Sequence, residues 1–487
     1  MERQEAPLFR SKQVERRAGF LHANEMAFMH NAFGIHSELF RRWALRSSVF
    51  LALVAVLGMA PCAYAQEPRP LSLDEAVTRA QENSFPVRSA AAQEDAVRAQ
   101  KRQSLAVFFP RLTAKEQFTA TTDPVNAFGF KLKQERFTSS DFQIGSLNDP
   151  ERIDNFNTQL EVQQPILNLD GIYQRRAAAD AVRAASSKRS RTEEVIGFRV
   201  KQGYFGLVLA ERRLEVIDKA LEAARANRDQ AQNLFDQGIV NRADLLAARV
   251  RVLELESQRT EANAGRRTAA DQLRFLMGMT EDVRIEPTDE LTLLPVQVDT
   301  VDVARVNQTR SDMQALRFRM DAAQEKSRSR WMAFVPKLNA LGRYQWNDEV
   351  AFGTMGSSWT AGASLTWSVF QGFEQIGKAQ QAEAEEQRAA IALEQQSVQN
   401  EVEIADALRQ LRAARQRVDQ TEAAVNQAEE SLRIRSDRFA EGMARTTDVL
   451  QAEAQLANRR LAFLQALYDH TMALYRLELL TEQSLAP

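Results

Sequence analysis

The sequence has few of the residues that carry most enzyme chemistry. Its 487 residues include one Cys and four His, and only His470 of these lies beyond residue 65. A chain shortened to start after that point has no thiol, which excludes disulfides and cysteine nucleophiles, and one imidazole cannot make a His-rich metal site. We also find no phosphate-binding Gly-rich loop and no Ser/His/Asp set. The sequence therefore predicts no catalytic residue, no metal, no cofactor and no enzyme activity.

A strong charge of one sign and a long hydrophobic run are also missing. Lys and Arg total 63 and Asp and Glu total 65, for a formal net charge of -2. This balance gives no electrostatic footprint for nucleic acid. The apolar run at residues 49–60 is too short to span a membrane as a helix.

That apolar run instead has the context of a secretory signal. Three Arg precede it at positions 41, 42 and 46, and Ala63-Tyr64-Ala65 follows it as a small-x-small cleavage sequence. We therefore predict that residues 1–65 form a leader containing a signal peptide, cleaved before Gln66. Cys62 leaves lipidation open as an alternative, although Pro61 is a poor neighbour for that processing.

Glycine and proline are sparse, at 19 and 13 residues, which favours long uninterrupted elements. Against that background the chain repeats itself. FDQGIVNRADLL at 235–246 returns as FAEGMARTTDVL at 439–450, and AVFFPRLTA at 106–114 returns as MAFVPKLNA at 332–340. We predict two repeats, at 66–290 and 291–487, each ordered helix, strand, strand, helix, with a longer excursion between the strands of the first.

The helical part has a seven-residue period. Apolar residues recur at steps of seven from Ile404 to Phe439, and at the equivalent positions from Val200 to Phe235 with Arg228 as the exception. A strict heptad predicts coiled-coil packing, because an ordinary amphipathic helix drifts by about 20° per heptad. A helix over 170–236 would be roughly 100 Å long.

Four segments have a period of two instead, at about 110–122, 155–166, 337–347 and 359–370. Pro110 and Pro336 mark the start of one strand in each repeat. One face of each strand is apolar with aromatic residues near its ends, which is typical of transmembrane β-strands. A soluble sheet with one wet face is the alternative. On the membrane interpretation, the residues expected to face lipid include Trp346, Trp359, Leu365 and Trp367.

Four strands cannot close a membrane barrel, because open edges in lipid leave backbone groups unpaired. Three copies would supply twelve strands, an even number within the usual range. The predicted fold is thus mainly α with a membrane β-barrel part, and it requires a homotrimer.

With these features together, the chain resembles the TolC-like outer-membrane efflux proteins, or outer-membrane factors. The resemblance covers about residues 71–484. It rests on the duplicated plan, on the Pro-Arg-Leu and Pro-Lys-Leu strand starts, and on the paired Phe-x-x-Gly...Asp-x-Leu turns. It implies a trimeric twelve-stranded barrel in the outer membrane, continued into the periplasm by a long α-helical tunnel.

The resemblance also implies a function and partners. Such a duct passively conducts cargo for a tripartite efflux or type I secretion system. A periplasmic membrane-fusion adaptor joins it to an inner-membrane exporter of the RND or ABC type. Because the pump selects the cargo, the sequence does not distinguish drugs, metals and proteins. The alternative is a periplasmic coiled-coil adaptor or scaffold, which would share the helices but lack the membrane-patterned strands.

The repeated turns are the predicted periplasmic tips. Gly238 and Gly442 would supply the positive φ that reverses each helix, with Asp244 and Asp448 near the positive end of the next helix. The resemblance places these aspartates at the aperture, Asp448 lining it and Asp244 linking hairpins through a donor such as Arg445. Helix capping alone is the alternative for both. The second tip has Phe439 where a hydrogen-bonding Tyr can stand, and Arg445 lies beside the usual basic latch position, so the latch is expected to differ.

Overall fold

The structure is a computed structural model that describes residues 69–281, 283–296, 298, 300–441 and 443–485. The predicted leader, its apolar run, Cys62 and Gly442 lie outside the described residues. The chain from Pro68 onward is one compact unit. Within the described ranges, no helix combines the length and the apolar character needed to cross a membrane.

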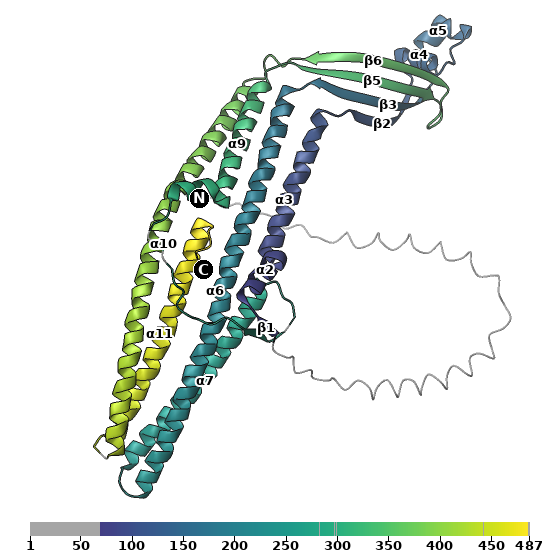
Figure 1. Cartoon of the computed structure of the whole chain (residues 1–487). Helices are drawn as coiled ribbons and strands as arrows, with labels where there is room; N and C mark the ends of the chain where they lie inside the picture. Colours follow the sequence, from purple (N-terminus) through teal and green to yellow (C-terminus); the bar gives the residue numbers. More distant parts are fainter. Residues whose placement is uncertain (1–68, 282, 297, 299, 442, 486–487) are drawn as a thin grey trace, which may run out of the picture. The chain divides into compact units, whose positions relative to one another are not determined.

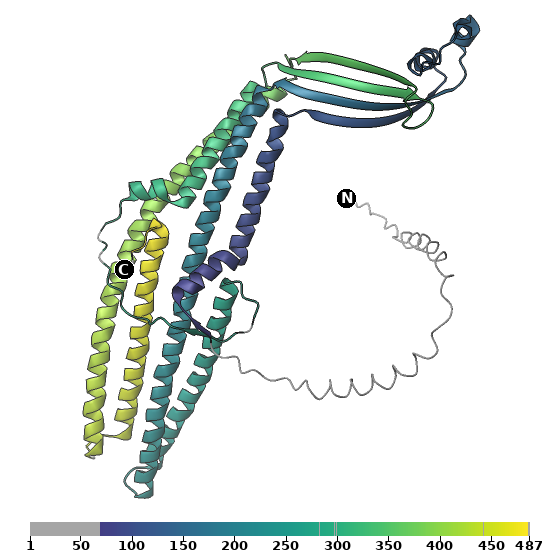
Figure 2. The same cartoon turned by 45° about the vertical axis from the view of Figure 1, so that its right-hand side comes forward.

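Two very long helices run through this unit, each with a shorter antiparallel partner (Figures 1 and 2). α6 spans Leu169–Asp236 and α10 spans Glu374–Ala440, with 68 and 67 residues. α7 (Arg242–Leu276) packs against α6, and α11 (Thr446–Thr481) packs against α10. At the other end α3 (Phe85–Gln103) contacts α6, and α9 (Ser311–Met332) contacts both α6 and α10.

The heptad positions hold these helices together. Val200, Leu207 and Leu221 of α6 are buried, as are Ile404, Leu411 and Val418 of α10. Burying a Leu or Val side chain contributes about 1.5–3 kcal/mol. Small residues occupy the alternate positions toward the turn, where Ala231 packs with Leu245 and Ala248 of α7.

The four longer strands form one antiparallel sheet in the order β2-β3-β5-β6. Their bounds are Arg111–Thr121, Ile153–Leu167, Lys337–Asp348 and Gly356–Thr366. Trp367, placed by the sequence within the last strand, lies just past its end. The ladder stops there because Thr366 pairs with Lys337, and Pro336, the residue before it, has no N–H to donate. The Trp367 indole donates instead to the Phe334 carbonyl, at 3.0 Å.

Smaller elements surround the middle of the helices. β1 (Arg69–Leu71) pairs in parallel with β4 (Ile285–Pro287), and α2 (Leu73–Asn83) packs on α6. The buried Tyr204 hydroxyl of α6 lies 2.6 Å from Asp289 Oδ2 and accepts a bond from the Thr288 backbone N–H, at 3.0 Å. Burial raises the pKa of Tyr204 to about 12, so it stays a neutral donor.

The C-terminal end of α11 is fixed by a buried arginine. Arg310 follows α8 (Val303–Thr309) and has only 1% of its surface exposed. Its guanidinium donates two bonds to the Asp312 carboxylate, both at 2.7 Å, and one to the Leu480 carbonyl, at 3.1 Å. A bidentate pair of this kind is stronger and more directional than a single bond.

The two repeats differ at the end of the sheet far from the helices. Residues 349–355 join β5 to β6 by a short turn. Between β2 and β3 the chain instead forms α4 (Pro124–Lys133), η2 (Ser139–Phe142) and α5 (Ile144–Asn148). We call residues 124–148 the cap. Figure 1 shows α4 and α5 at the end of the sheet that lies far from the long helices.

Candidate channel wall and tip

The strand register gathers the apolar side chains on one face of the sheet. Leu112 faces Val162, and Leu160 and Trp359 both face Tyr344 on the central strand β5. Successive side chains along a strand point to opposite faces of the sheet. Once one row of paired residues is assigned to a face, the register therefore assigns every other row. The apolar face comprises Leu112, Ala114, Phe118, Ala120, Phe156, Leu160, Val162, Leu338, Ala340, Tyr344, Trp346, Trp359, Ala361, Ala363 and Leu365.

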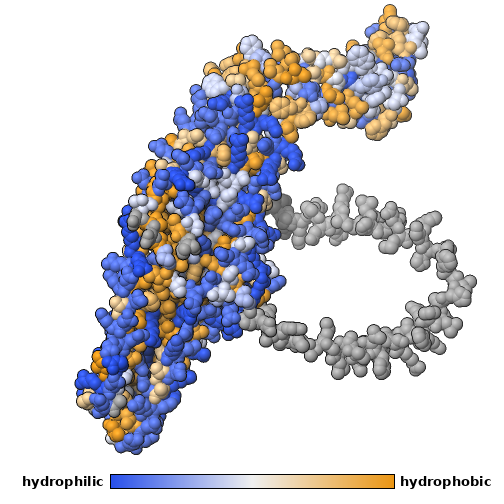
Figure 3. Space-filling model, viewed as in Figure 1, coloured by the Kyte–Doolittle hydropathy of each residue, from blue (hydrophilic) through white to orange (hydrophobic). Residues whose placement is uncertain are grey.

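This apolar face is uncovered in the single chain. Trp359 is 74% exposed and Leu365 is 68% exposed. Figure 3 shows orange residues gathered over the sheet, whereas the surface of the helices is mostly blue. A contiguous apolar surface of this kind marks an interaction with lipid or another protein. Polar residues on this face, Glu116 and Thr158, bond to each other in the row of Trp346.

Aromatic residues bound the apolar face at both ends. Tyr344 pairs with Trp359 in one row, and Trp346 follows in the next row on the same face, with its ring centroid 4.7 Å from that of Tyr344. Near the helices the exposed rings are Phe108, Phe109, Trp367, Phe370 and Phe373. From Trp359 to Trp367 the chain advances roughly 26 Å at about 3.3 Å per residue. A strand tilt of about 40° turns this into about 20 Å of height, close to the roughly 25 Å apolar band of outer-membrane barrels.

The opposite face of the sheet is polar. Arg343 donates to Glu161 at 2.8 Å, and Gln345 donates to Ser358 at 3.0 Å. At the end next to the helices, Lys337 forms an ion pair with Asp170 of α6 at 2.7 Å. Pro110 and Pro336 immediately precede β2 and β5, where a missing N–H costs the ladder nothing.

The cap lies on the polar face, a placement that sequence reasoning missed. Gln134, fully buried at the end of α4, donates to Asn155 Oδ1 at 2.9 Å. Asn155 in turn donates to Asn347 of β5 at 3.1 Å. A Cβ added to Gly356 would lie 1.9 Å from the Lys133 carbonyl oxygen. All three strand residues belong to the polar face, so the backbone of α4 rests on that side.

The first predicted tip has the expected turn geometry. Gly238 has φ +74° and directly follows the C-cap of α6. The Ile239 N–H donates to the Leu234 carbonyl at 2.9 Å, which is the six-to-one bond of a Schellman motif. Asn241 caps α7 by accepting from the Asp244 N–H at 3.0 Å. This leaves the Asp244 carboxylate half-buried, with no bond to another described residue.

At the second tip, the first turn of α11 is held by hydrogen bonds to the backbone. α11 begins at Thr446, and the Arg445 N–H donates to Asp448 Oδ2 at 3.3 Å. Arg435 of α10 donates to the Asp448 carbonyl, also at 3.3 Å. Phe439 is half-buried in the last turn of α10 and Arg445 is exposed. Within the described part of the protomer, no ion pair joins Asp244 to Arg445.

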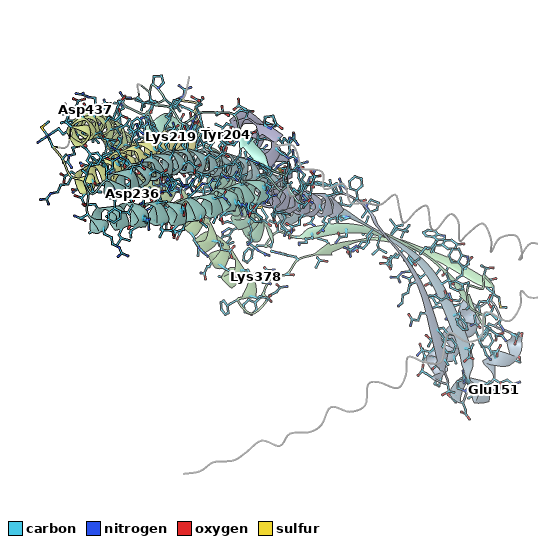
Figure 4. All side chains as sticks on the ribbon, turned by 90° about the horizontal axis from the view of Figure 1, so that it is seen from below. Glu151, Tyr204, Lys219, Asp236, Lys378 and Asp437 are labelled. Carbon is cyan, nitrogen blue, oxygen red and sulfur yellow. The ribbon has the colours of Figure 1, made fainter. Side chains whose placement is uncertain are left out.

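Both tips lie at the same end of the molecule. Figure 4 labels Asp236 and Asp437, near the ends of α6 and α10, far from Glu151 beside the cap. Leu450 of α11 packs on the tip cluster of α6 and α7, and Asn227 donates to Glu453 at 2.6 Å. The two hairpins therefore contact each other within one chain, while sheet and tips occupy opposite ends.

A sheet with one lipid-type face, carried on helices that end in paired turns, defines an outer-membrane channel with a helical extension. The family model for outer membrane efflux proteins matches residues 76–279 and 303–482. The chain belongs to this family, and it is an outer-membrane exit duct of a tripartite efflux or type I secretion system, with a tunnel that extends into the periplasm.

Individual relatives are distant in sequence and close in fold. The alkaline protease secretion protein AprF of Pseudomonas aeruginosa is 22% identical over 348 residues, covering 68% of this chain and 71% of AprF. A membrane protein crystal structure from P. aeruginosa has a TM-score of 0.73 at 20% identity, covering 84% of this chain and 92% of that one. The Campylobacter jejuni CmeC outer membrane channel has a TM-score of 0.72 at 16% identity, covering 84% and 85%.

Proposed function

We propose that three copies of this chain close a single twelve-stranded barrel whose apolar face meets outer-membrane lipid. The sheet order leaves β2 and β6 as its edges, and each edge carries a row of unpaired N–H and C=O groups. In lipid these groups need partners, so β6 of one copy would pair with β2 of the next. A repeated head-to-tail contact of this kind closes into a ring.

The helices support the same arrangement. α3 contacts α6, α6 contacts α9, and α9 contacts α10, so the helices form a curved wall in the same lateral order as the strands above them. In the proposed trimer α10 would lie beside α3 of the neighbouring copy, and the wall would close into the tunnel. The polar face of the sheet would then line the barrel.

We further propose that the tips dock a periplasmic membrane-fusion adaptor bound to an inner-membrane exporter. Membership of the outer membrane efflux protein family supports a role in such a multi-protein system. The inner-membrane exporter of that system would be of the RND or the ABC type. AprF is named for secretion of a protease, which favours an ABC-type secretion partner, while CmeC is named as an outer membrane channel.

For the organisation of the chain, we propose a leader at residues 1–65 and two repeats at residues 66–290 and 291–487.

At the aperture we propose different roles for the two aspartates. Three copies of Asp448 would form a ring of like charge. The position of Asp448 beside the second turn supports this role. Asp244, whose carboxylate has no described partner in its own chain, would bond to Arg445 of a neighbouring hairpin. Gly238 and Gly442 would form the turns, with Phe439 packed behind them.

Native mass spectrometry of the purified protein in detergent tests the assembly. We expect a trimer, because an open sheet leaves two unpaired edges. The protomer mass should correspond to a chain beginning at Gln66, and a diacylglycerol adduct on Cys62 would instead show a lipoprotein. A stable monomer under the same conditions would contradict the shared barrel.

A further inference from the structure

We propose that the barrel contains a cationic belt, Arg111 and Lys115, that binds multivalent anions as they pass through. The inference rests on the proposed function, because it takes the polar face of the sheet as the barrel lining. Both side chains are exposed on that face, two rows apart on β2. Each side chain projects from the sheet into the space through which cargo would move.

The single chain does not neutralise these two cations. The one acidic side chain among the nearby polar-face rows is Glu161, and it is already bonded to Arg343 at 2.8 Å. The Lys115 ammonium donates to the neutral amide of Gln117 at 2.7 Å. Arg111 forms no ion pair with any described residue. The Glu161–Arg343 pair lies in the row between them and adds no net charge.

The neighbouring copy would not neutralise them either. β2 is an edge strand, and in the proposed ring its new partner is β6. β6 reads GSSWTAGASLT and has no charged residue. Its polar-face side chains are hydroxyls, from Ser358, Thr360, Ser364 and Thr366. The seam therefore leaves two uncompensated cations per copy, and six around the ring.

Charges of one sign inside a low-dielectric wall concentrate counterions. A lined cleft of this kind raises the local concentration of opposite charge by about 10- to 1,000-fold at low salt. The effect fades where the Debye length falls to about 3 Å, near 1 M salt. The belt is therefore expected to favour anionic cargo in the barrel, independently of any aspartate ring at the tip.

Side-specific block in planar bilayers separates the belt from the tip. With tripolyphosphate added on the barrel side in about 0.1 M KCl, the wild-type channel should be blocked. The double variant Arg111→Gln/Lys115→Gln should need about tenfold more tripolyphosphate or more. Glu161→Gln/Arg343→Gln is the matched control: it alters the same face without changing net charge, and block should persist.

The exchange Arg111→Lys/Lys115→Arg should also keep the block, because charge rather than side-chain shape carries the effect. A conducting trimer that tripolyphosphate does not block, or that is blocked equally in the Arg111→Gln/Lys115→Gln variant, would overturn the belt while leaving the duct intact. Absence of any conducting trimer in the wild type would instead count against the proposed function itself.

A second observation independently carries another inference: we infer that the cap narrows the outer mouth of the barrel. Gln134, Asn155 and Asn347 form a buried chain of amides on the polar face, and Gly356 leaves room for the α4 backbone there. A buried amide network is costly to separate, because its donors and acceptors would lose their partners. The cap is thus held on the side that the proposed barrel encloses.

Entry of polyethylene glycols from the barrel side tests this directly, since it does not depend on the tip. Replacing residues 123–152 by the short connection found at 349–355 should raise the largest polymer that enters and lowers conductance. Gln134→Leu, which removes the bond to Asn155 at similar volume, should shift the cut-off in the same direction. Val125→Ser, on the exposed side of α4, is the control. An unchanged cut-off in the shortened variant would refute the narrowing.

Discussion

Leu365→Arg is expected to abolish stable insertion of the trimer. Leu365 is 68% exposed on the apolar face and pairs with Leu338 of β5. An Arg facing lipid costs about 2–4 kcal/mol at the bilayer midplane and about 0–1 kcal/mol near the interface. Leu365 lies between these depths, two residues before Trp367, so we expect a cost of about 1–2 kcal/mol per copy and about 3–6 kcal/mol for the three copies of the trimer. A total of that size is a large fraction of the stability of many proteins. Heat-resistant trimers in purified outer membranes are the measurement.

Ser364→Arg provides the matched control one residue away. Ser364 faces Asn339 on the polar side, where an Arg stays hydrated, so insertion should be near normal. Equal loss of trimer in both variants would point to damage to the strand rather than to a lipid-facing side. Normal trimers in Leu365→Arg would show that this face does not meet lipid.

Asp244→Ala is expected to loosen the closed tip and raise resting conductance. The Asp244 carboxylate has no described partner in its own chain, while its backbone N–H is held by Asn241. Loss of the carboxylate should therefore leave the Asn241 N-cap of α7 in place and remove only the proposed link to Arg445. An exposed ion pair contributes about 0.5 kcal/mol. Three links would then shift the ratio of open to closed states by about tenfold.

Asp448→Asn should act on block rather than on closure. Asn keeps the oxygen that accepts the Arg445 N–H, so α11 should still begin at Thr446. Loss of the charge should weaken block by a divalent cation or polycation added on the tip side. Single-channel recordings measure both quantities. Unchanged conductance in Asp244→Ala together with unchanged block in Asp448→Asn would reduce both residues to parts of helix ends.

The elements themselves were readable because their periods are long and unbroken. Heptad positions such as Leu207 and Leu411 proved to be buried, and the period of two at Leu338–Trp346 gave the face that the register confirms. Strand ends were less predictable. The last strand stops at Thr366 because its partner strand begins after a proline, which no property of Trp367 itself could indicate.

The candidate site was less visible in the sequence than the fold. At the first tip the N-cap of α7 is Asn241, a residue type that favours this position. At the other tip the cap position is held by Arg445, although Thr446 follows it, because a cap contributes only about 1 kcal/mol and the turn decides the boundary. The bond from Asn155 to Asn347, which continues the contact made by Gln134, joins residues 192 positions apart, so no local pattern marks it.

The sheet order also affects how the assembly forms. β3 and β5 come from different repeats, yet they pair within one chain, whereas the equivalent contact between β6 and β2 must join two chains in the proposed ring. Because of the duplication, every second contact between repeats around the ring joins two repeats of the same chain. Each association of free partners costs about 4–15 kcal/mol in lost translational and rotational freedom. Six separate halves would meet that cost at more encounters than three whole chains, so tandem repeats lower the concentration at which the duct can form.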